Sequence, residues 1–183
     1  GGRTMSCIGL FMHHDRGADL AIDAIDWLAS RGHEVRLATD QAASLGRDDL
    51  GVPESQLSAG LDLMMSLGGD GTMLRAVDLV AVDEVPVLGI NLGRLGYLTE
   101  VEPSGLRMAL KRFLAGSYSI EERLRLDVTV ERADGEVERL TALNEAVIEK
   151  SEMGHTVRLD VELDGLPFTS YVSDGLILAT PTG

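Results

Sequence analysis

The stretch that decides the fold is LMMSLGGDGTMLRAV, from Leu63 to Val77. It begins as an apolar run typical of a strand buried on both faces and passes, through Gly68, Gly69 and Gly71, into a helical pattern. A buried strand needs no glycine and a helix start needs at most a cap, so this composition indicates a turn that a ligand approaches closely. Asp70, the one charged residue among these glycines, calls for a reason of its own.

Strand and helix patterns alternate on both sides of this stretch. Such alternation predicts right-handed crossovers and a doubly wound, mostly parallel sheet with helices on both faces. The expected strands cover residues 5–12, 33–40, 60–69 and 85–93, and the expected helices cover residues 17–32, 72–82 and 102–118. We expect the last of these helices to link two domains.

After Tyr118 the pattern becomes that of a β-rich domain. Apolar and polar residues alternate around Asp134-Gly135 and again around Asp164-Gly165, which predicts two hairpins. We therefore expect an α/β domain that carries GGDGT over residues 1–120 and a β-rich, sandwich-like domain over residues 121–183. The sequence ends on a loop-forming Pro-Thr-Gly directly after an apolar strand, so the second domain is expected to be incomplete.

The composition excludes several classes of partner. The formal net charge is −14, and only Lys111 and Lys150 are lysines, so no basic patch favours nucleic acid or an anionic membrane. No apolar run approaches the ~20 residues of a membrane-spanning helix. The single Cys7 excludes an internal disulfide and reads as a small core residue. We expect a cytoplasmic protein.

Three roles are open to Asp70. It cannot bind phosphate directly, because like charges repel, so it holds a metal, accepts a proton from a hydroxyl or caps the helix. The sequence lacks a G-x-x-x-x-G-K-[ST] P-loop and a G-x-G-x-x-G dinucleotide turn. A carboxylate placed beside phosphates and a substrate hydroxyl suits phosphoryl transfer. The alternative is a plain glycine turn whose aspartate caps a helix.

A second glycine-rich turn follows the next predicted strand. GINLGRLGYLTE, residues 89–100, places Gly89, Gly93 and Gly96 at the same expected sheet edge as LGGDGT, and two such loops make a cleft. LNEAVIE and DGLILATPTG follow later in the chain. In this order and spacing the four motifs resemble those of the ATP-dependent NAD kinase family, also known as inorganic polyphosphate/ATP-NAD kinases.

The resemblance implies roles for residues of the two glycine turns. Asp70 matches the catalytic aspartate, which binds the adenosine ribose of NAD and takes the proton of its 2′-hydroxyl as that oxygen attacks the γ-phosphate of ATP. Arg75, one turn into the helix, either faces the phosphates or is a solvated surface residue. Tyr97 either contacts the base of the substrate or packs in the core. The phosphate-approach loop would be lined by Gly68, Gly69, Gly71 and Thr72.

The resemblance also implies binding residues in the β-rich half. Asn144 and Glu145 match an Asn-Glu pair at the dinucleotide, and both can serve one ligand only at a strand end or bulge, because neighbouring strand residues point to opposite faces. Asp174 matches an aspartate on the nicotinamide side, often across a subunit boundary. Thr182 would contact the adenine-ribose side, and His155 would reach a phosphate.

By this resemblance the expected activity is Mg²⁺-dependent transfer of the γ-phosphate of ATP to NAD, giving NADP. The metal would come with the ATP phosphates and have no dedicated protein ligands, and the expected assembly is a homodimer or homotetramer. The alternatives are a non-catalytic NAD- or NADP-binding module and a GGDGT-type lipid or sugar-phosphate kinase. The sequence leaves open the use of polyphosphate, the preference for NAD or NADH, and feedback regulation. The family pattern continues beyond TPTG, so a cut-short chain is expected here too.

Overall fold

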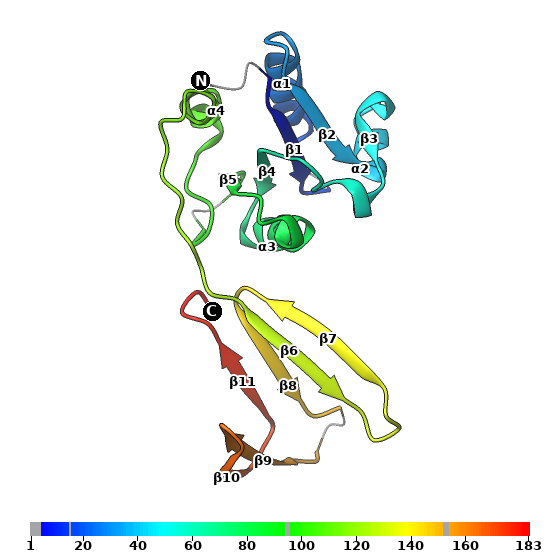
Figure 1. Cartoon of the computed structure of the whole chain (residues 1–183), viewed down its shortest axis with the longest axis vertical. Coiled ribbons are helices and arrows are strands. Elements are labelled where there is room, and N and C mark those ends of the chain that lie inside the picture. Colours follow the sequence, from blue (N-terminus) through cyan, green and yellow to red (C-terminus); the bar gives the residue numbers. More distant parts are fainter. Residues whose placement is uncertain (1–4, 15, 94–95, 152–153) are drawn as a thin grey trace. The chain divides into compact units, whose positions relative to one another are not determined.

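The computed structural model describes residues 5–14, 16–93, 96–151 and 154–183. The chain divides into two compact units, residues 1–120 and residues 121–183. The first unit is an α/β layer structure and the second is built from β-hairpins (Figure 1).

The first unit is built on a parallel sheet whose strand order is β3-β2-β1-β4-β5. β1 and β4 are almost wholly buried, as the apolar runs of the sequence predict for central strands covered on both faces. The strands are β1 (Cys7–Met12), β2 (Glu34–Ala38), β3 (Gly51–Val52), β4 (Leu63–Gly68) and β5 (Val87–Asn91).

Helices cover both faces of this sheet, which confirms the doubly wound α/β fold. Ile25 and Leu28 of α1 share one core cluster with Leu106 and Leu110 of α4. On the opposite face, Ala76 and Val80 of α3 belong to a second cluster. The helices are α1 (Ala18–Ala29), α2 (Thr39–Ser44), α3 (Asp70–Val80) and α4 (Leu106–Leu114), with short 3-10 turns at Asp48–Leu50, Glu54–Gln56, Ala81–Asp83 and Pro103–Gly105.

The structure corrects several predicted element boundaries. The second strand ends at Ala38, and Thr39 already begins α2, which the sequence pattern did not indicate. α3 begins at Asp70, two residues earlier than the helical pattern suggested. The two-residue β3 is too short for a pattern of apolar alternation to reveal it. α4 covers only Leu106–Leu114 of the predicted helix 102–118, and its buried Leu106 and Leu110 belong to the core of the first unit.

Two predicted hairpins are present in the second unit. Asp164 and Gly165 both have positive φ, 53° and 75°, which is the backbone conformation of a type I′ hairpin turn. Gly135, at the tip of the other hairpin, also has positive φ. The strands that these turns join are β6 (Leu126–Glu131) and β7 (Val137–Ala142), and β9 (Val157–Leu163) and β10 (Leu166–Ser173).

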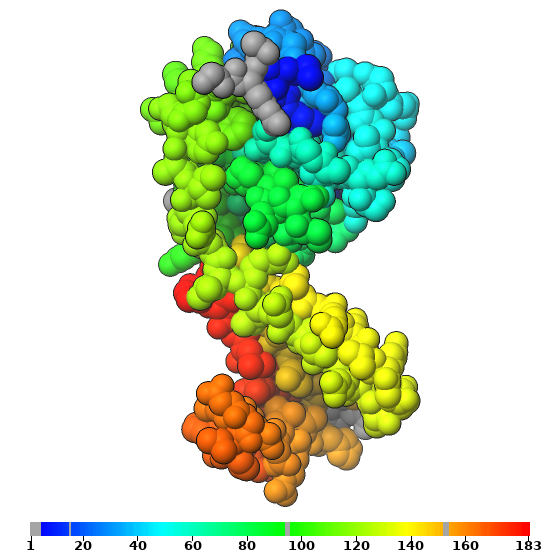
Figure 2. All heavy atoms as spheres, viewed as in Figure 1, coloured from blue at the N-terminus to red at the C-terminus, as the bar shows by residue number. Residues whose placement is uncertain are grey.

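A third antiparallel pair in this unit was not predicted. β8 (Glu145–Glu149) pairs with β11 (Gly175–Ala179), so that Glu145 lies opposite Ala179. This pairing brings together two motifs that are separated in the sequence, LNEAVIE at residues 143–149 and DGLILATPTG at residues 174–183. Several apolar side chains of β8 and β11 are exposed, namely Val147, Ile148, Ile177 and Leu178. Figure 2 shows red atoms of the β11 segment at the surface in this view.

Candidate functional site

The LGGDGT turn forms a close connection between β4 and α3. Gly69 is the N-cap, and Asp70 is the first helical residue. A Cβ on Gly68 would lie 2.5 Å from the Cβ of Thr72 and still closer to its hydroxyl, so only glycine fits there. The helix therefore starts directly at the carboxyl edge of the sheet, where its free N–H groups favour negative charge.

The second glycine-rich turn begins at the end of the neighbouring strand β5. The side-chain oxygen of Asn91 accepts a hydrogen bond from the N–H of Gly93 (3.0 Å), which forms the turn. The N–H of Leu92 donates to the carbonyl oxygen of Gly68 (3.1 Å), so this turn is tied to the first one. The prediction that both glycine-rich turns lie at one edge of the sheet is confirmed.

The Asp70 carboxylate is held by the second turn. The N–H of Tyr97 donates to Oδ2 (2.8 Å), and the N–H of Leu98 donates to Oδ1 (3.0 Å). Gly96 lies against the same group, since a Cβ there would be 2.9 Å from Cγ of Asp70 and 3.0 Å from the Thr99 hydroxyl oxygen. That hydroxyl is buried and makes no hydrogen bond among the described residues. The carboxylate position is thus fixed by two backbone donors and a glycine.

Two side chains near this site, those of Tyr97 and Arg75, lie on the surface. The Tyr97 side chain is 87% exposed, so the alternative that it packs in the core is wrong. The Arg75 guanidinium donates to the Glu54 carboxylate (2.8 Å), and both side chains are about half exposed. An exposed pair of this kind stabilises a protein by at most about 1 kcal/mol. Arg75 is therefore on the surface, and a role toward phosphates stays a prediction.

In the second unit, the Asn-Glu pair lies at the end of a strand. Asn144 occupies a bend, and Glu145 is the first residue of β8. The carbonyl oxygen of Asn144 accepts a hydrogen bond from the N–H of Thr180 (2.8 Å), and the Thr180 hydroxyl donates to Leu143 (2.6 Å). The Asn144 side-chain oxygen is buried without a hydrogen-bond partner in the part of the chain described. The strand-end position that shared binding would require is confirmed.

The other predicted residues of the second unit lie at strand ends and turns. Asp174, between β10 and β11, is 79% exposed at its side chain and pairs with the Lys150 ammonium (2.5 Å). Thr182 accepts a hydrogen bond from the Arg123 guanidinium (3.3 Å). His155 is exposed just before β9. Their roles in binding stay predictions.

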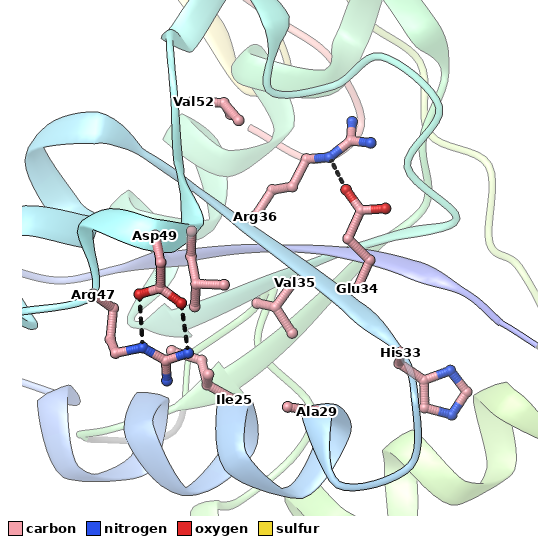
Figure 3. A pocket seen from close by; sticks show the side chains of 10 residues that line it. Ile25, Ala29, His33, Glu34, Val35, Arg36, Arg47, Asp49 and Val52 are labelled. Atoms are coloured by element: carbon pink, nitrogen blue, oxygen red, sulfur yellow. Dashed lines mark hydrogen bonds and ion pairs between the residues drawn. The ribbon is translucent and has the colours of Figure 1, made fainter.

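A hollow on the first unit lies away from the glycine-rich turns. It is bounded by α1, β2 and the segment around Asp49, and none of its lining residues belongs to either turn. Figure 3 shows that its charged groups satisfy each other: Arg47 donates to both oxygens of Asp49 (3.0 Å each), and Arg36 donates to Glu34 (2.6 Å). The Arg47 guanidinium also lowers the pKa of Asp49. The charged side chains Glu34, Arg36, Arg47 and Asp49 of this hollow are thus already paired with one another.

The described residues contain no cluster of three or more His, Cys, Asp or Glu side chains that could hold a metal ion. None of their helices is long and apolar enough to cross a membrane. Cys7 is buried in β1, and this burial raises the pKa of its thiol to about 11. The prediction that Cys7 is a small core residue is confirmed.

Sequence reasoning missed Arg16 and the role of Gly96. Arg16 lies in the loop after β1, and one of its guanidinium nitrogens would be 3.7 Å from a Cβ on Gly93 of the second turn. A basic residue shortly after the first strand of a parallel sheet was the available signal, because loops at that end of the strands line the ligand site. For Gly96 no sequence signal distinguished it from the other glycines.

Comparison with known proteins places the chain in a family. Residues 14–118 match the family model described as the ATP-NAD kinase N-terminal domain. The chain is 45% identical over 168 residues to an NAD kinase of Moorella thermoacetica, and 38% identical over 187 residues to one of Geotalea daltonii. These alignments cover 92% and 98% of the chain but 53% and 63% of the relatives. The chain belongs to the ATP-NAD kinase family and spans only about half to two thirds of the length of these relatives.

Two solved structures share the fold. A yeast NADH kinase complexed with NADH matches with a TM-score of 0.90 and 23% identity, over 99% of this chain and 59% of that one. An NAD kinase from Archaeoglobus fulgidus in complex with ATP matches with a TM-score of 0.67 and 24% identity, over 94% and 60%. At this level of identity the likeness confirms the two-part α/β and β-rich fold.

Proposed function

We propose that this protein transfers the γ-phosphate of ATP to the 2′-hydroxyl of the adenosine ribose of NAD, giving NADP, with Asp70 as the catalytic base. The observation that carries the proposal is the position of Asp70. Its carboxylate stands at the first turn of α3, between two glycine-rich turns, and is fixed by the amides of Tyr97 and Leu98. Membership of the ATP-NAD kinase family supports the choice of substrates.

The geometry of Asp70 leaves room for a substrate hydroxyl. A carboxylate offers roughly four lone-pair sites, and the two amides use two of them. The remaining sites can accept the hydrogen bond of a ribose hydroxyl and then its proton as the oxygen attacks phosphorus. Because phosphoryl transfer depends mainly on positioning and charge, a carboxylate held rigidly by two backbone donors suits this step.

The phosphates of ATP would approach the glycine turns. Gly69 and Gly71 have open space where a side chain would stand, at a helix N-terminus, which suits a phosphate. We propose that Gly68 and Thr72, which pack against each other, complete this loop. The Mg²⁺ ion would be bound mainly through these phosphates, as Mg²⁺ commonly is in kinase sites. When bound, the ion would neutralise the triphosphate charge.

The second unit would supply polar groups for the dinucleotide. We propose Asn144, Glu145, Asp174 and Thr182 for this role, and His155 for a phosphate. The support is that β8–β11 pairing places the Asn-Glu bend beside the TPTG loop. A cytoplasmic location and a homodimer or homotetramer are proposed from the family resemblance.

The test is a coupled assay of NADP formation from NAD and Mg-ATP, with Asp70→Asn as the variant. The matched control is Asp78→Asn, which removes an exposed carboxylate from the same helix. We expect Asp70→Asn to lower kcat by about 10²–10⁴-fold with NAD affinity retained, and Asp78→Asn to change it little. Binding of NAD without any turnover in the unmodified protein would indicate a binding module, and turnover of a lipid or sugar phosphate instead of NAD would indicate the other kinases.

A further inference from the structure

Arg16 differs from most other arginines of the first unit. In a chain of net charge −14, Arg36, Arg47, Arg75 and Arg107 each form an ion pair with a carboxylate. The Arg16 guanidinium has no ion pair or hydrogen bond to any residue that the structure describes. An arginine left unpaired in so acidic a protein is available for an anion from outside the chain.

The loop that carries Arg16 is held firmly in place. The side chain of Gln41 bonds to both the N–H and the carbonyl oxygen of Met12, at 3.0 and 2.8 Å. The N–H of His13 donates to Leu67 of β4 (2.9 Å). The backbone of Gly17, with φ of 95°, lies so close to Leu92 that a Cβ would be 2.7 Å from that side chain. The N–H of Arg16 itself donates to the carbonyl oxygen of His13 (3.2 Å), so the backbone at Arg16 is tied to the residue that follows β1.

This loop lies at the same edge of the sheet as Asp70. β1 and β5 flank β4, and Met12 is level with Leu67 while Gly68 is level with Asn91. The Arg16 guanidinium lies near the second glycine-rich turn, since one of its nitrogens would be 3.7 Å from a Cβ on Gly93. A cation, a glycine turn and the N-terminal end of α3 therefore stand along one edge.

We propose that Arg16 binds a phosphate group of the phosphoryl donor at the carboxyl edge of the sheet, between the loop after β1 and the turn at Gly93. The planar guanidinium can donate two parallel hydrogen bonds to phosphate oxygens, and the open backbone at Gly93 lets the phosphate come close. This inference rests on the proposed function. The recognised group is a polyphosphate chain, whether it belongs to ATP or to inorganic polyphosphate.

Binding measurements on the intact protein test this site. Calorimetric titrations with the non-hydrolysable ATP analogue AMP-PNP and with inorganic tripolyphosphate would compare the unmodified protein with Arg16→Ala and Arg16→Lys. We expect Arg16→Ala to weaken the binding of both by roughly ten- to a hundredfold, since a charge-assisted hydrogen bond is lost. Arg16→Lys keeps the charge but cannot donate two parallel hydrogen bonds, so its affinity for both compounds should lie between those of Arg16→Ala and the unmodified protein. NAD affinity should stay unchanged.

Arg31→Ala is the matched control. It removes the same charge from the other end of α1, about 18 Å away at 1.5 Å per residue, where Arg31 lies over the Trp27 ring. Both phosphate compounds should bind Arg31→Ala within about twofold of the unmodified protein, because screened charges at that distance contribute little.

The outcomes separate this inference from the proposed function. If the unmodified protein makes NADP and Arg16→Ala binds both compounds normally, the Arg16 site is wrong and the kinase proposal stands. If Arg16→Ala weakens AMP-PNP but not tripolyphosphate, the contact is to the nucleoside and the phosphate site is wrong. If the unmodified protein binds neither compound and makes no NADP, both proposals fail. Weakened binding of tripolyphosphate as well as AMP-PNP supports a site that reads the phosphates of either donor.

Discussion

Replacing Gly96 with alanine should displace the Asp70 carboxylate. The added methyl carbon would lie 2.9 Å from Cγ of Asp70 and nearer still to Oδ1, whereas ordinary contact begins at 3.4 Å. The shortfall at Cγ is 3.4 − 2.9 = 0.5 Å, and at the oxygen it is larger. The methyl carbon cannot shift toward Thr99 instead, because the Thr99 hydroxyl oxygen would already be 3.0 Å from it. The carboxylate must therefore move away from the amides of Tyr97 and Leu98.

The size of the effect follows from the hydrogen bonds lost. Tyr97 is exposed and its N–H can turn to water, but Leu98 is buried and its N–H would be left unpaired. Leaving one buried donor unpaired costs about 1–3 kcal/mol. Since 1.4 kcal/mol corresponds to a factor of ten, local opening at Leu98 should become roughly ten- to a hundredfold easier. A shift of about 1 Å in a catalytic group costs on the order of a hundredfold in rate.

Amide hydrogen exchange is the assay that addresses this contact directly. Exchange at the Leu98 amide should accelerate by roughly ten- to a hundredfold in Gly96→Ala, and kcat for NADP formation should fall by about a hundredfold with little change in the KM for NAD. Gly105→Ala is the matched control, since its methyl would meet no atom of Asp70 or Thr99 and only Cγ1 of Val101, at 3.1 Å. It should leave both exchange at Leu98 and kcat within about twofold of the unmodified protein.

The reasoning would be refuted if Gly96→Ala is folded and its Leu98 amide exchanges as slowly as that of the Gly105→Ala control. It would mean that the second turn adapts to the methyl group without releasing Asp70. Full activity together with lost protection would instead show that the two amides do not position the base. Far-ultraviolet circular dichroism of both variants would establish that each is folded.

Two further predictions concern the core of the first unit. Gln41→Leu leaves the N–H and the carbonyl oxygen of Met12 unpaired in a buried place. The free energy of unfolding measured by urea titration should therefore fall by about 2–4 kcal/mol. For the control Gln56→Leu, on an exposed turn, it should stay within about 0.5 kcal/mol of the unmodified protein. The Cys7 thiol, whose pKa is raised from 9.0 to about 11 chiefly by burial, stays protonated in the folded state after the unfolded state has lost its proton. Stability should therefore decrease as the pH rises from about 9 toward 11, and the same titration on Cys7→Ala should show a smaller decrease; equal slopes would contradict the assignment.

The strands and helices of the first unit were predictable because each carries a local pattern. The apolar runs of β1, β4 and β5 and the helical spacing of α1 and α3 are recorded in consecutive residues. The two hairpins of the second unit were predictable for the same reason, since Asp134-Gly135 and Asp164-Gly165 favour a tight turn. Boundaries were less certain: Asp70 and Thr39 join helices because the preceding strands end there.

Sequence patterns could not predict the pairing of β8 with β11 or the two amide hydrogen bonds to the Asp70 carboxylate. Each depends on residues more than twenty positions apart, and no local pattern records which distant segment will lie beside a given residue. Arg16 could have been suspected from its place after β1, but only the structure places its guanidinium near Gly93. Tyr97 could be core or surface until the structure exposed its side chain.

The sequence by itself determined the family, the alternation of strands and helices, and the two glycine-rich turns with Asp70 in the first of them. These features are local because they follow from residue spacing and from the small size of glycine. The tertiary structure alone decided that backbone amides of the second turn donate to both oxygens of Asp70, that Gly96 must lack a side chain there, and that the Arg16 guanidinium lies near Gly93 at the same edge. Such contacts arise because a parallel sheet brings the carboxyl ends of strands β1, β4 and β5 together although they lie far apart along the chain.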